Sequence, residues 1–209
     1  MKFLPTTKEE MKSLGWDSID VLLISGDTYL DTSYNGSALV GKWLVEHGFK
    51  VGIIAQPEVD VPDDITRLGE PNLFFAISGG CVDSMVANYT ATKKRRQQDD
   101  FTPGGENNKR PDRAVLVYSN MIRRFFKGTT KKIVISGIES SLRRITHYDY
   151  WTNKLRKPIL FDAKADILSY GMGEMSMLQL ANALKNGEDW QNIRGLCYLS
   201  KEPKEDYLS

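Results

Sequence analysis

The sequence predicts an α/β protein with a doubly wound, mainly parallel sheet of the flavodoxin-like type. Short apolar segments alternate with segments of helical spacing, and most of the apolar segments end at Gly, Ser or an acid. Near-continuous apolar strands are typical of a parallel sheet that is covered on both faces. We therefore expect five core strands in the spatial order 2-1-3-4-5, with a ligand crevice at the carboxyl ends of strands one, three and four.

The expected strands are six short apolar runs that end at turn residues. They are residues 20–25 (DVLLIS), 50–55 (KVGIIA), 72–78 (NLFFAIS), 132–136 (KIVIS), 166–170 (DILSY) and, as a sixth edge strand, 193–199. Apolar residues at helical spacing predict helices over residues 37–47, 63–68, 82–92, 114–126 and 175–185. Gly48 and Gly187 lie where two of these helices should end, and glycine is the usual residue there.

Residues 93–113 (KKRRQQDDFTPGGENNKRPDR) form a long polar insertion in what we expect to be a single domain covering residues 1–209. A stretch of this length without apolar periodicity is either functional or disordered. Its basic residues favour a polyanion partner, which makes an RNA-binding module one alternative function. Acids are interleaved among them, however, and a solvated or self-paired loop is the commoner meaning of such a run.

Composition excludes several classes of protein. The formal net charge is +1, so bulk charge indicates neither nucleic acid nor an anionic membrane as partner. No apolar run approaches the roughly 20 residues of a membrane-spanning helix, and residues 1–16 lack the apolar segment of a signal peptide, so the cytoplasm is the expected location. Cys81 and Cys197 match no metal-ligand spacing, and we expect two buried or partly buried thiols with no metal site.

Candidate binding residues lie in the loops at the strand ends, which are rich in Gly, Ser and acids. Glycine allows a ligand to approach the backbone closely, and free N–H groups at the start of a helix bind anions. Turn geometry alone also explains a glycine after a strand, so both interpretations stay open. The sequence contains no Walker A, GxGxxG or GxSxG motif, and no phosphate cradle of known type is predicted.

A second group of candidates lies in residues 140–151 (SSLRRITHYDYW). Its arginines suit a carboxylate or phosphate, and its aromatic rings suit a planar ligand or partner, although a purely structural aromatic cluster is equally consistent. We assign binding roles and no catalytic step to both groups. The candidates are Asp27, Asp31, Ser33, Gly79, Gly80, Glu139, Arg143, Arg144, His147, Tyr148, Gly171, Gly173 and Glu174.

Three long, specific strings carry a resemblance to a known family. They lie in residues 80–113 (above all DSMVANYTA and FTPGGENNKRPDRA), 136–151 (SGIESSLRRITHYDYW) and 162–174 (DAKADILSYGMGE). With LLISGDTYLD and VGIIAQP they cover nearly the whole chain, and they resemble the N-terminal region of the YgiQ-type family of uncharacterised radical S-adenosylmethionine (SAM) proteins. The resemblance implies a cobalamin-binding-type α/β domain that precedes a radical SAM barrel.

In that family the barrel holds a [4Fe–4S] cluster on a CxxxCxxC motif. This chain has no such motif and only two cysteines, so we expect the cluster and SAM in the full-length protein and no cofactor in this chain. The implied role is an accessory domain that positions a substrate or partner for the downstream barrel. The chain by itself is not expected to be catalytic.

Cobalamin binding depends on the loop after the first strand. Many cobalamin domains carry a DxHxxG motif there, and the corresponding stretch here is residues 31–36 (DTSYNG), in which Ser33 replaces the histidine. This excludes histidine ligation from that loop and leaves binding without histidine open, although Tyr29 and Tyr34 would occupy space that a corrin needs. A stand-alone protein that binds a cobalamin-like or nucleotide-like molecule is the other alternative function.

Overall fold

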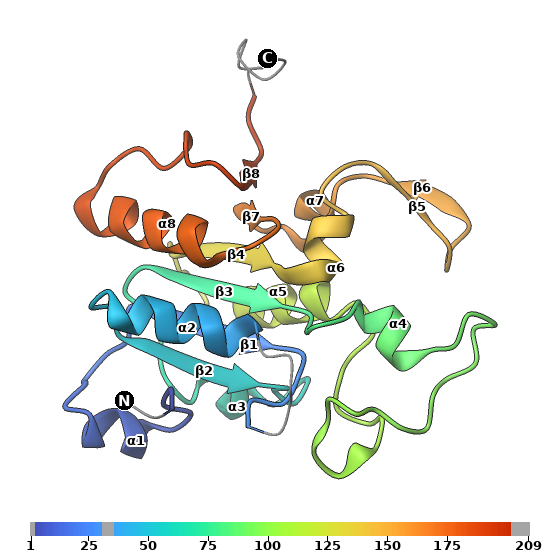
Figure 1. The fold of residues 1–209 in the computed structure, drawn as a ribbon, viewed down its shortest axis with the longest axis horizontal. Helices are drawn as coiled ribbons and strands as arrows, with labels where there is room; N and C mark the ends of the chain where they lie inside the picture. Colours follow the sequence, from blue (N-terminus) through green and yellow to red (C-terminus); the bar gives the residue numbers. More distant parts are fainter. Residues whose placement is uncertain (1–2, 31–35, 202–209) are drawn as a thin grey trace.

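The structure, a computed structural model, describes residues 3–30 and 36–201, and Figure 1 shows a twisted central sheet with helices on both faces. The strands are β1 (Val21–Ser25), β2 (Val51–Ala55), β3 (Phe74–Ser78), β4 (Lys132–Ser136), β5 (His147–Asp149), β6 (Lys154–Arg156), β7 (Ile167–Ser169) and β8 (Leu196–Tyr198). The helices are α1 (Lys8–Ser13), α2 (Gly36–Glu46), α3 (Pro62–Thr66), α4 (Ser84–Asn88), the 3-10 helix η1 (Pro103–Gly105), α5 (Ala114–Phe125), α6 (Gly137–Leu142), α7 (Ile159–Ala163) and α8 (Glu174–Asn186).

The main sheet has the strand order β2-β1-β3-β4-β7-β8. Its first five strands are parallel and correspond to the predicted order 2-1-3-4-5, while β8 pairs with β7 in the antiparallel direction as the expected sixth edge strand. Within the described part of the chain, no helix is long and apolar enough to span a membrane. The predicted fold class is therefore confirmed.

Alternate residues along the strands face two separate apolar layers. Leu22 and Ile24 of β1 join the layer that contains Tyr118 and Ile122 of α5. Val21 and Leu23 face the opposite layer, which α2 and α8 cover. All five residues of β1 are buried because both faces of this strand are packed. Burial on both faces explains why the strands read as continuous apolar runs.

Two regions without a predicted helix or strand contain regular structure. The insertion is folded, because it contains η1 and two isolated bridges, Tyr89–Arg95 and Gln98–Glu106. Residues 140–151 contain the end of α6 and strand β5, and β5 pairs with β6 in a hairpin that is separate from the main sheet. The predicted helix over residues 82–92 is also shorter, since the backbone becomes extended at Tyr89 after α4.

Candidate functional site

A pocket of about 550 Å³ lies at the carboxyl edge of the main sheet, where the loops after β1, β3, β4 and β7 meet α2 and the start of α8. The strand order places β1 and β3 at the centre of this edge, where the connections leave in opposite directions. Open α/β sheets bind ligands at such a switch point. The volume suits a small organic molecule or one part of a larger one.

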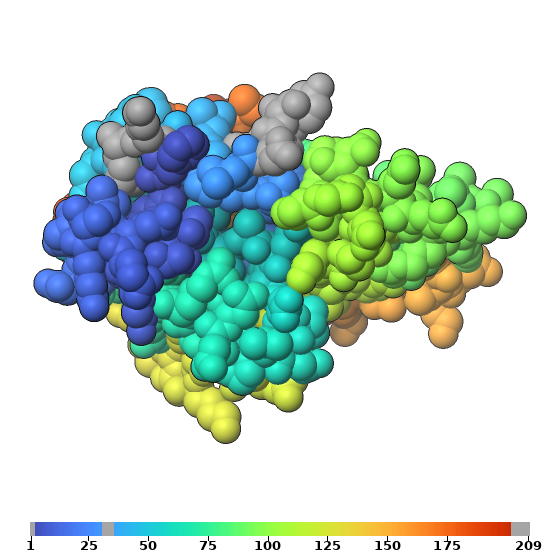
Figure 2. Space-filling view, turned by 90° about the horizontal axis from the view of Figure 1, so that it is seen from below, coloured from blue at the N-terminus to red at the C-terminus, as the bar shows by residue number. Residues whose placement is uncertain are grey.

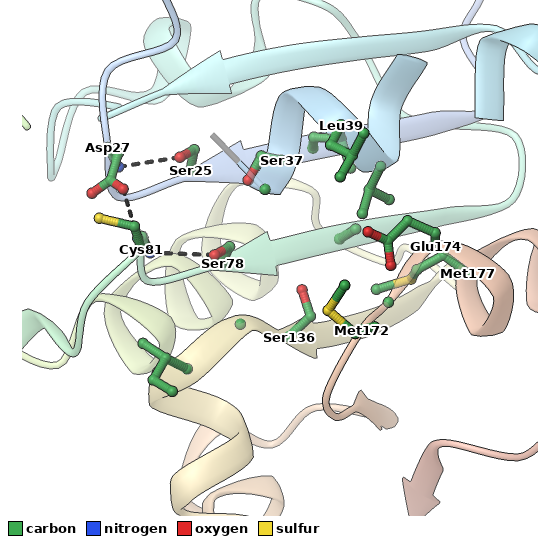
Figure 3. A pocket seen from close by; sticks show the side chains of 18 of the residues that line it. Ser25, Asp27, Ser37, Leu39, Ser78, Cys81, Ser136, Met172, Glu174 and Met177 are labelled. Atoms are coloured by element: carbon green, nitrogen blue, oxygen red, sulfur yellow. Dashed lines mark hydrogen bonds between the residues drawn. The ribbon is translucent and has the colours of Figure 1, made fainter. Parts of the chain in front are cut away.

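A row of serines lines the base of this pocket (Figure 3). Ser25, Ser78 and Ser136 are register partners at the last positions of β1, β3 and β4. The hydroxyl oxygens of Ser25 and Ser78 accept backbone N–H groups at 3.1 and 3.2 Å. Since a hydroxyl both accepts and donates, each of these two retains a proton that it can donate to a ligand.

The walls of the pocket are mainly apolar. Leu39 and Val40 come from α2, and Met172 and Met177 lie on the opposite side, in the loop after β7 and in α8. The charged side chains among the described lining residues are two acids, Asp27 and Glu174. Hydroxyl donors below apolar walls, with no lysine, arginine or histidine among the lining residues that the structure describes, favour an uncharged ligand with hydrogen-bond acceptors.

Asp27 joins the pocket to the insertion. Its carboxylate forms an ion pair with the buried Arg110 at 2.7 Å, and Arg110 also pairs with Asp99 at 3.3 Å and donates to the Gly26 carbonyl at 3.1 Å. Burial raises the pKa of Asp27, while the Arg110 charge and the Cys81 N–H oppose that rise. The Asp27–Arg110 pair therefore holds the insertion against the end of β1.

Cys81 lies beside Asp27 at the same edge and lines the pocket. Its backbone N–H donates to the Asp27 carboxylate at 2.6 Å. Burial and the negative charge of Asp27 raise the pKa of the Cys81 thiol to about 12. The thiol is therefore protonated near neutral pH and is a poor nucleophile.

Glu139 is not among the residues that line the pocket, and its carboxylate instead accepts hydrogen bonds from the first turns of two helices. It accepts the Ser84 N–H at 3.0 Å and the Val115 N–H at 3.4 Å, in the first turns of α4 and α5. Burial and the nearby Asp83 raise the pKa of this carboxyl group. These contacts give Glu139 the role of a shared helix cap, because the first N–H groups of a helix have no partner within it.

Four candidates from residues 140–151 also lie away from the pocket. Arg143 forms an ion pair with Asp83, and the Arg144 guanidinium lies 5.3 Å from the centre of the Tyr170 ring. His147 and Tyr148 belong to the hairpin strand β5. Of the candidate binding residues predicted from the sequence, five therefore line the pocket: Asp27, Gly80, Gly171, Gly173 and Glu174.

The remaining candidates are glycine and loop residues of the same edge. Gly79 lies beside the pocket, and its carbonyl oxygen is so close to Gly26 that a Cβ there would stand 2.1 Å from it. Asp31 and Ser33, like Tyr34, lie outside the described residues. The lining residues that the sequence did not select include the three serines, although a serine at the end of successive apolar runs was a visible signal.

The basic residues of the insertion are largely paired. Of its seven lysines and arginines, four form ion pairs within the described chain: Arg95 with Asp112, Lys109 with Glu58, Arg110 as above, and Arg113 with Asp149. This arrangement favours the self-paired alternative for the insertion over a polyanion-binding patch.

Sequence comparison places the chain among longer proteins. Residues 3–208 match the family model described as "Radical SAM N-terminal". A UPF0313 protein of Fusobacterium nucleatum is 96% identical over 209 residues, which are 100% of this chain and 37% of that protein. UPF0313 proteins of Thermotoga neapolitana (54% identical, 98% of this chain and 36% of the relative) and Methanocaldococcus jannaschii (53%, 91% and 31%) are similar too. The chain thus spans about a third of the length of these relatives.

Two solved structures of the radical SAM methyltransferase TsrM from Kitasatospora setae share the fold. The structure with cobalamin and a [4Fe–4S] cluster aligns with a TM-score of 0.57 and 16% identity over 88% of this chain and 28% of that one. The structure with tryptophan and a SAM analogue aligns with a TM-score of 0.56 and 16% identity over 87% and 28%. The likeness confirms the predicted flavodoxin-like fold, of the kind found in cobalamin-binding domains.

Proposed function

This chain belongs to the radical SAM N-terminal family, and we propose that it is an accessory domain that holds a small molecule at the sheet-edge pocket for the radical SAM portion of a longer protein. The lengths of the relatives support this role, because about two thirds of each lies outside the matched region. A stand-alone binding protein would not require that additional region.

The row of serine hydroxyls beneath apolar walls is the observation that carries the proposal. The hydroxyl protons of Ser25 and Ser78 favour a ligand with hydrogen-bond acceptor atoms, and the methionine and leucine side chains would cover the apolar part of that ligand. We assign the pocket a binding and orienting role, since two of its reactive side chains, Asp27 and Cys81, are not available for catalysis. Asp27 is held by Arg110, and the Cys81 thiol stays protonated.

The radical chemistry itself would come from cofactors that this chain does not hold. A [4Fe–4S] cluster of this family needs three cysteine ligands, and the chain has two cysteines. The residues present also do not fit ligation of cobalt in cobalamin, because no histidine occurs among the described residues that line the pocket. We propose a substrate, or a chemical group of a partner, as the occupant, and the cobalamin incubation described below tests the binding of cobalamin without a histidine ligand.

Ligand capture tests this function. The purified chain is incubated with a small-molecule extract of bacterial cells, washed and analysed by mass spectrometry for retained compounds. The comparison variant is Leu39→Trp, which places an indole over a pocket wall, and the matched control is Leu14→Trp, a substitution beside α1 outside the pocket lining. We expect an uncharged compound to be retained by the wild type and the control and lost from Leu39→Trp.

Equal retention by all three proteins would contradict the proposal, as would capture of polyphosphates alone. A parallel incubation with cobalamin separates the remaining alternative. An absorption band of the corrin that stays with the wild type and is lost from Leu39→Trp would show that the pocket takes cobalamin in place of a substrate.

A further inference from the structure

Exposed apolar side chains occur on α6, on the hairpin β5–β6 and in the loop after β7. Tyr148 and Leu155 are register partners of the hairpin and are 58% and 76% exposed. Leu142 lies one turn after Ile138 on α6, and both side chains are exposed. We call this surface the hairpin face; it comprises Ile138, Leu142, Ile145, Tyr148, Leu155 and Met172.

The hairpin is fixed in its outward position by a buried carboxylate. Asp149 of β5 receives Arg113 at 2.8 Å, Arg156 at 3.0 Å and the Thr152 hydroxyl at 2.5 Å. Burial alone would raise the pKa of Asp149, but the Thr152 hydrogen bond and Arg113 hold it well below its ordinary value. A two-stranded hairpin is marginal by itself, so these contacts are what hold Tyr148 and Leu155 toward solvent.

The segment that leads from α4 into the insertion, together with Lys93 of the insertion itself, supports the hairpin from a second side. The Tyr150 hydroxyl donates to the Ala91 carbonyl at 2.8 Å, and the Lys93 ammonium donates to the Tyr150 carbonyl at 3.1 Å. The rings of Tyr89 and Trp151 also meet, with centroids 4.9 Å apart. Figure 2 shows the insertion in green and the hairpin in orange side by side, in one lobe that projects from the body of the molecule.

We propose that the hairpin face is the surface on which the radical SAM portion of the full-length protein docks. This inference rests on the proposed function and names the partner of the same site. Large exposed apolar patches mark interaction surfaces, and the relatives carry about two thirds of their length outside the region that matches this chain. That additional polypeptide is always present at high effective concentration, because it is linked covalently.

The location of the hairpin face explains why docking there would serve the pocket. Ile138 and Met172 belong both to the hairpin face and to the pocket lining. A domain seated on the face would therefore also cover the mouth of the pocket and exclude water from its occupant. Basic side chains beside the face, Arg144, Lys154 and Lys157, form no ion pair within the described residues, and they predict an acidic rim on the partner.

Hydrogen–deuterium exchange in the full-length F. nucleatum relative, compared with the chain of residues 1–209, tests the docking. Covered amides open less often, so we expect the amides of residues 138–156 to exchange at least about tenfold more slowly in the full-length protein. Amides of α1 and α3, which lie elsewhere on the fold, should exchange equally in both proteins.

Two substitutions on the face, Leu142→Glu and Leu155→Glu, should together restore the faster exchange in the full-length protein. Val59→Glu replaces another exposed apolar residue outside the face and should leave the protection unchanged. A photo-crosslinking side chain at position 155 gives a second readout that does not depend on destabilising the interface, and it should join the hairpin to the polypeptide beyond residue 209.

Equal exchange in the two proteins, or no effect of the paired glutamates, would overturn the docking proposal. Sedimentation of the isolated chain as a dimer that Leu155→Glu disrupts would also overturn it, in favour of a second copy as the occupant. The proposed function can be judged separately, because exchange and crosslinking report docking without any ligand. Loss of ligand capture with intact protection would refute the pocket role alone.

Discussion

Replacement of Arg110 by methionine provides a stringent test of how the insertion is attached to the sheet. The Arg110 side chain is 0% exposed and pairs with Asp27 and Asp99, whose side chains are 3% and 1% exposed. Arg110→Met keeps most of the side-chain volume but leaves both carboxylates buried without their cation. Removing one partner of a buried ion pair costs about 3–5 kcal/mol, which is a large part of the about 5–15 kcal/mol that stabilises a typical domain.

Chemical denaturation followed by circular dichroism measures this loss of unfolding free energy. In a separate thermal unfolding experiment, the melting temperature should fall by about 10 °C, because each kcal/mol of lost stability corresponds to about 2–4 °C in a domain of this size. The triple variant Arg110→Met, Asp27→Asn, Asp99→Asn should regain much of the stability, since a buried cluster replaced as a whole is often tolerated. A loss below about 1 kcal/mol in Arg110→Met, a value typical of exposed ion pairs, would refute the buried-cluster interpretation.

The same variant has a defined pH dependence. Burial already raises the pKa of Asp27, and the Arg110 charge opposes that rise. Without Arg110 the folded-state pKa rises further above the unfolded value. A group with a raised folded pKa contributes its stability at low pH and loses it as the pH increases through that folded pKa. The loss of unfolding free energy in Arg110→Met relative to the wild type should therefore be smaller in mild acid than at neutral pH.

Three further substitutions or reactions test individual contacts. Glu139→Gln should lower the unfolding free energy by about 1–3 kcal/mol, because the amide nitrogen would face a helix N–H in place of an acceptor oxygen; an unchanged denaturation midpoint would contradict the shared-cap role. Gly26→Ala should lower the unfolding free energy by about 1–3 kcal/mol, since the new Cβ would stand 2.1 Å from the Gly79 carbonyl oxygen. A melting curve identical to that of the wild type would contradict this steric clash. Cys81, with its pKa raised to about 12, should react with iodoacetamide at pH 8 far more slowly than free cysteine, as followed by mass spectrometry, and rapid alkylation would show that the thiolate is accessible.

The strands were predictable because their burial is local in the sequence. VLLIS, FFAIS and KIVIS are apolar apart from Lys132 and the serine at the end of each strand, since both faces of each strand are packed. The short turns rich in glycine after them, together with the alternation with helices, were enough to give the strand order and the position of the pocket. The strand order of the main sheet therefore depends on the pattern of apolar residues along the chain more than on any single contact.

The hairpin and the folded insertion were not predictable from local pattern. Asp149 is satisfied by Arg113, which lies far away in the sequence, and Arg110 reaches back to Asp27 over an even longer separation. Glu139 likewise caps helices whose first turns begin near Ser84 and Val115. A single sequence reveals that such polar residues are present, but it does not reveal which of them are paired in the fold. For this reason several residues first assigned to ligand binding have clear structural contacts.

The most direct test of the accessory role separates SAM cleavage from the use of the pocket in the full-length F. nucleatum relative. We predict that Leu39→Trp leaves the basal reductive cleavage of SAM unchanged, because the residues that would hold the cluster lie outside this chain, whose two cysteines are too few. We expect a bacterial small-molecule extract to stimulate this cleavage in the wild type and in Leu14→Trp, and not in Leu39→Trp. Stimulation that persists in Leu39→Trp would contradict the claim that the sheet-edge pocket positions a molecule for the radical SAM portion.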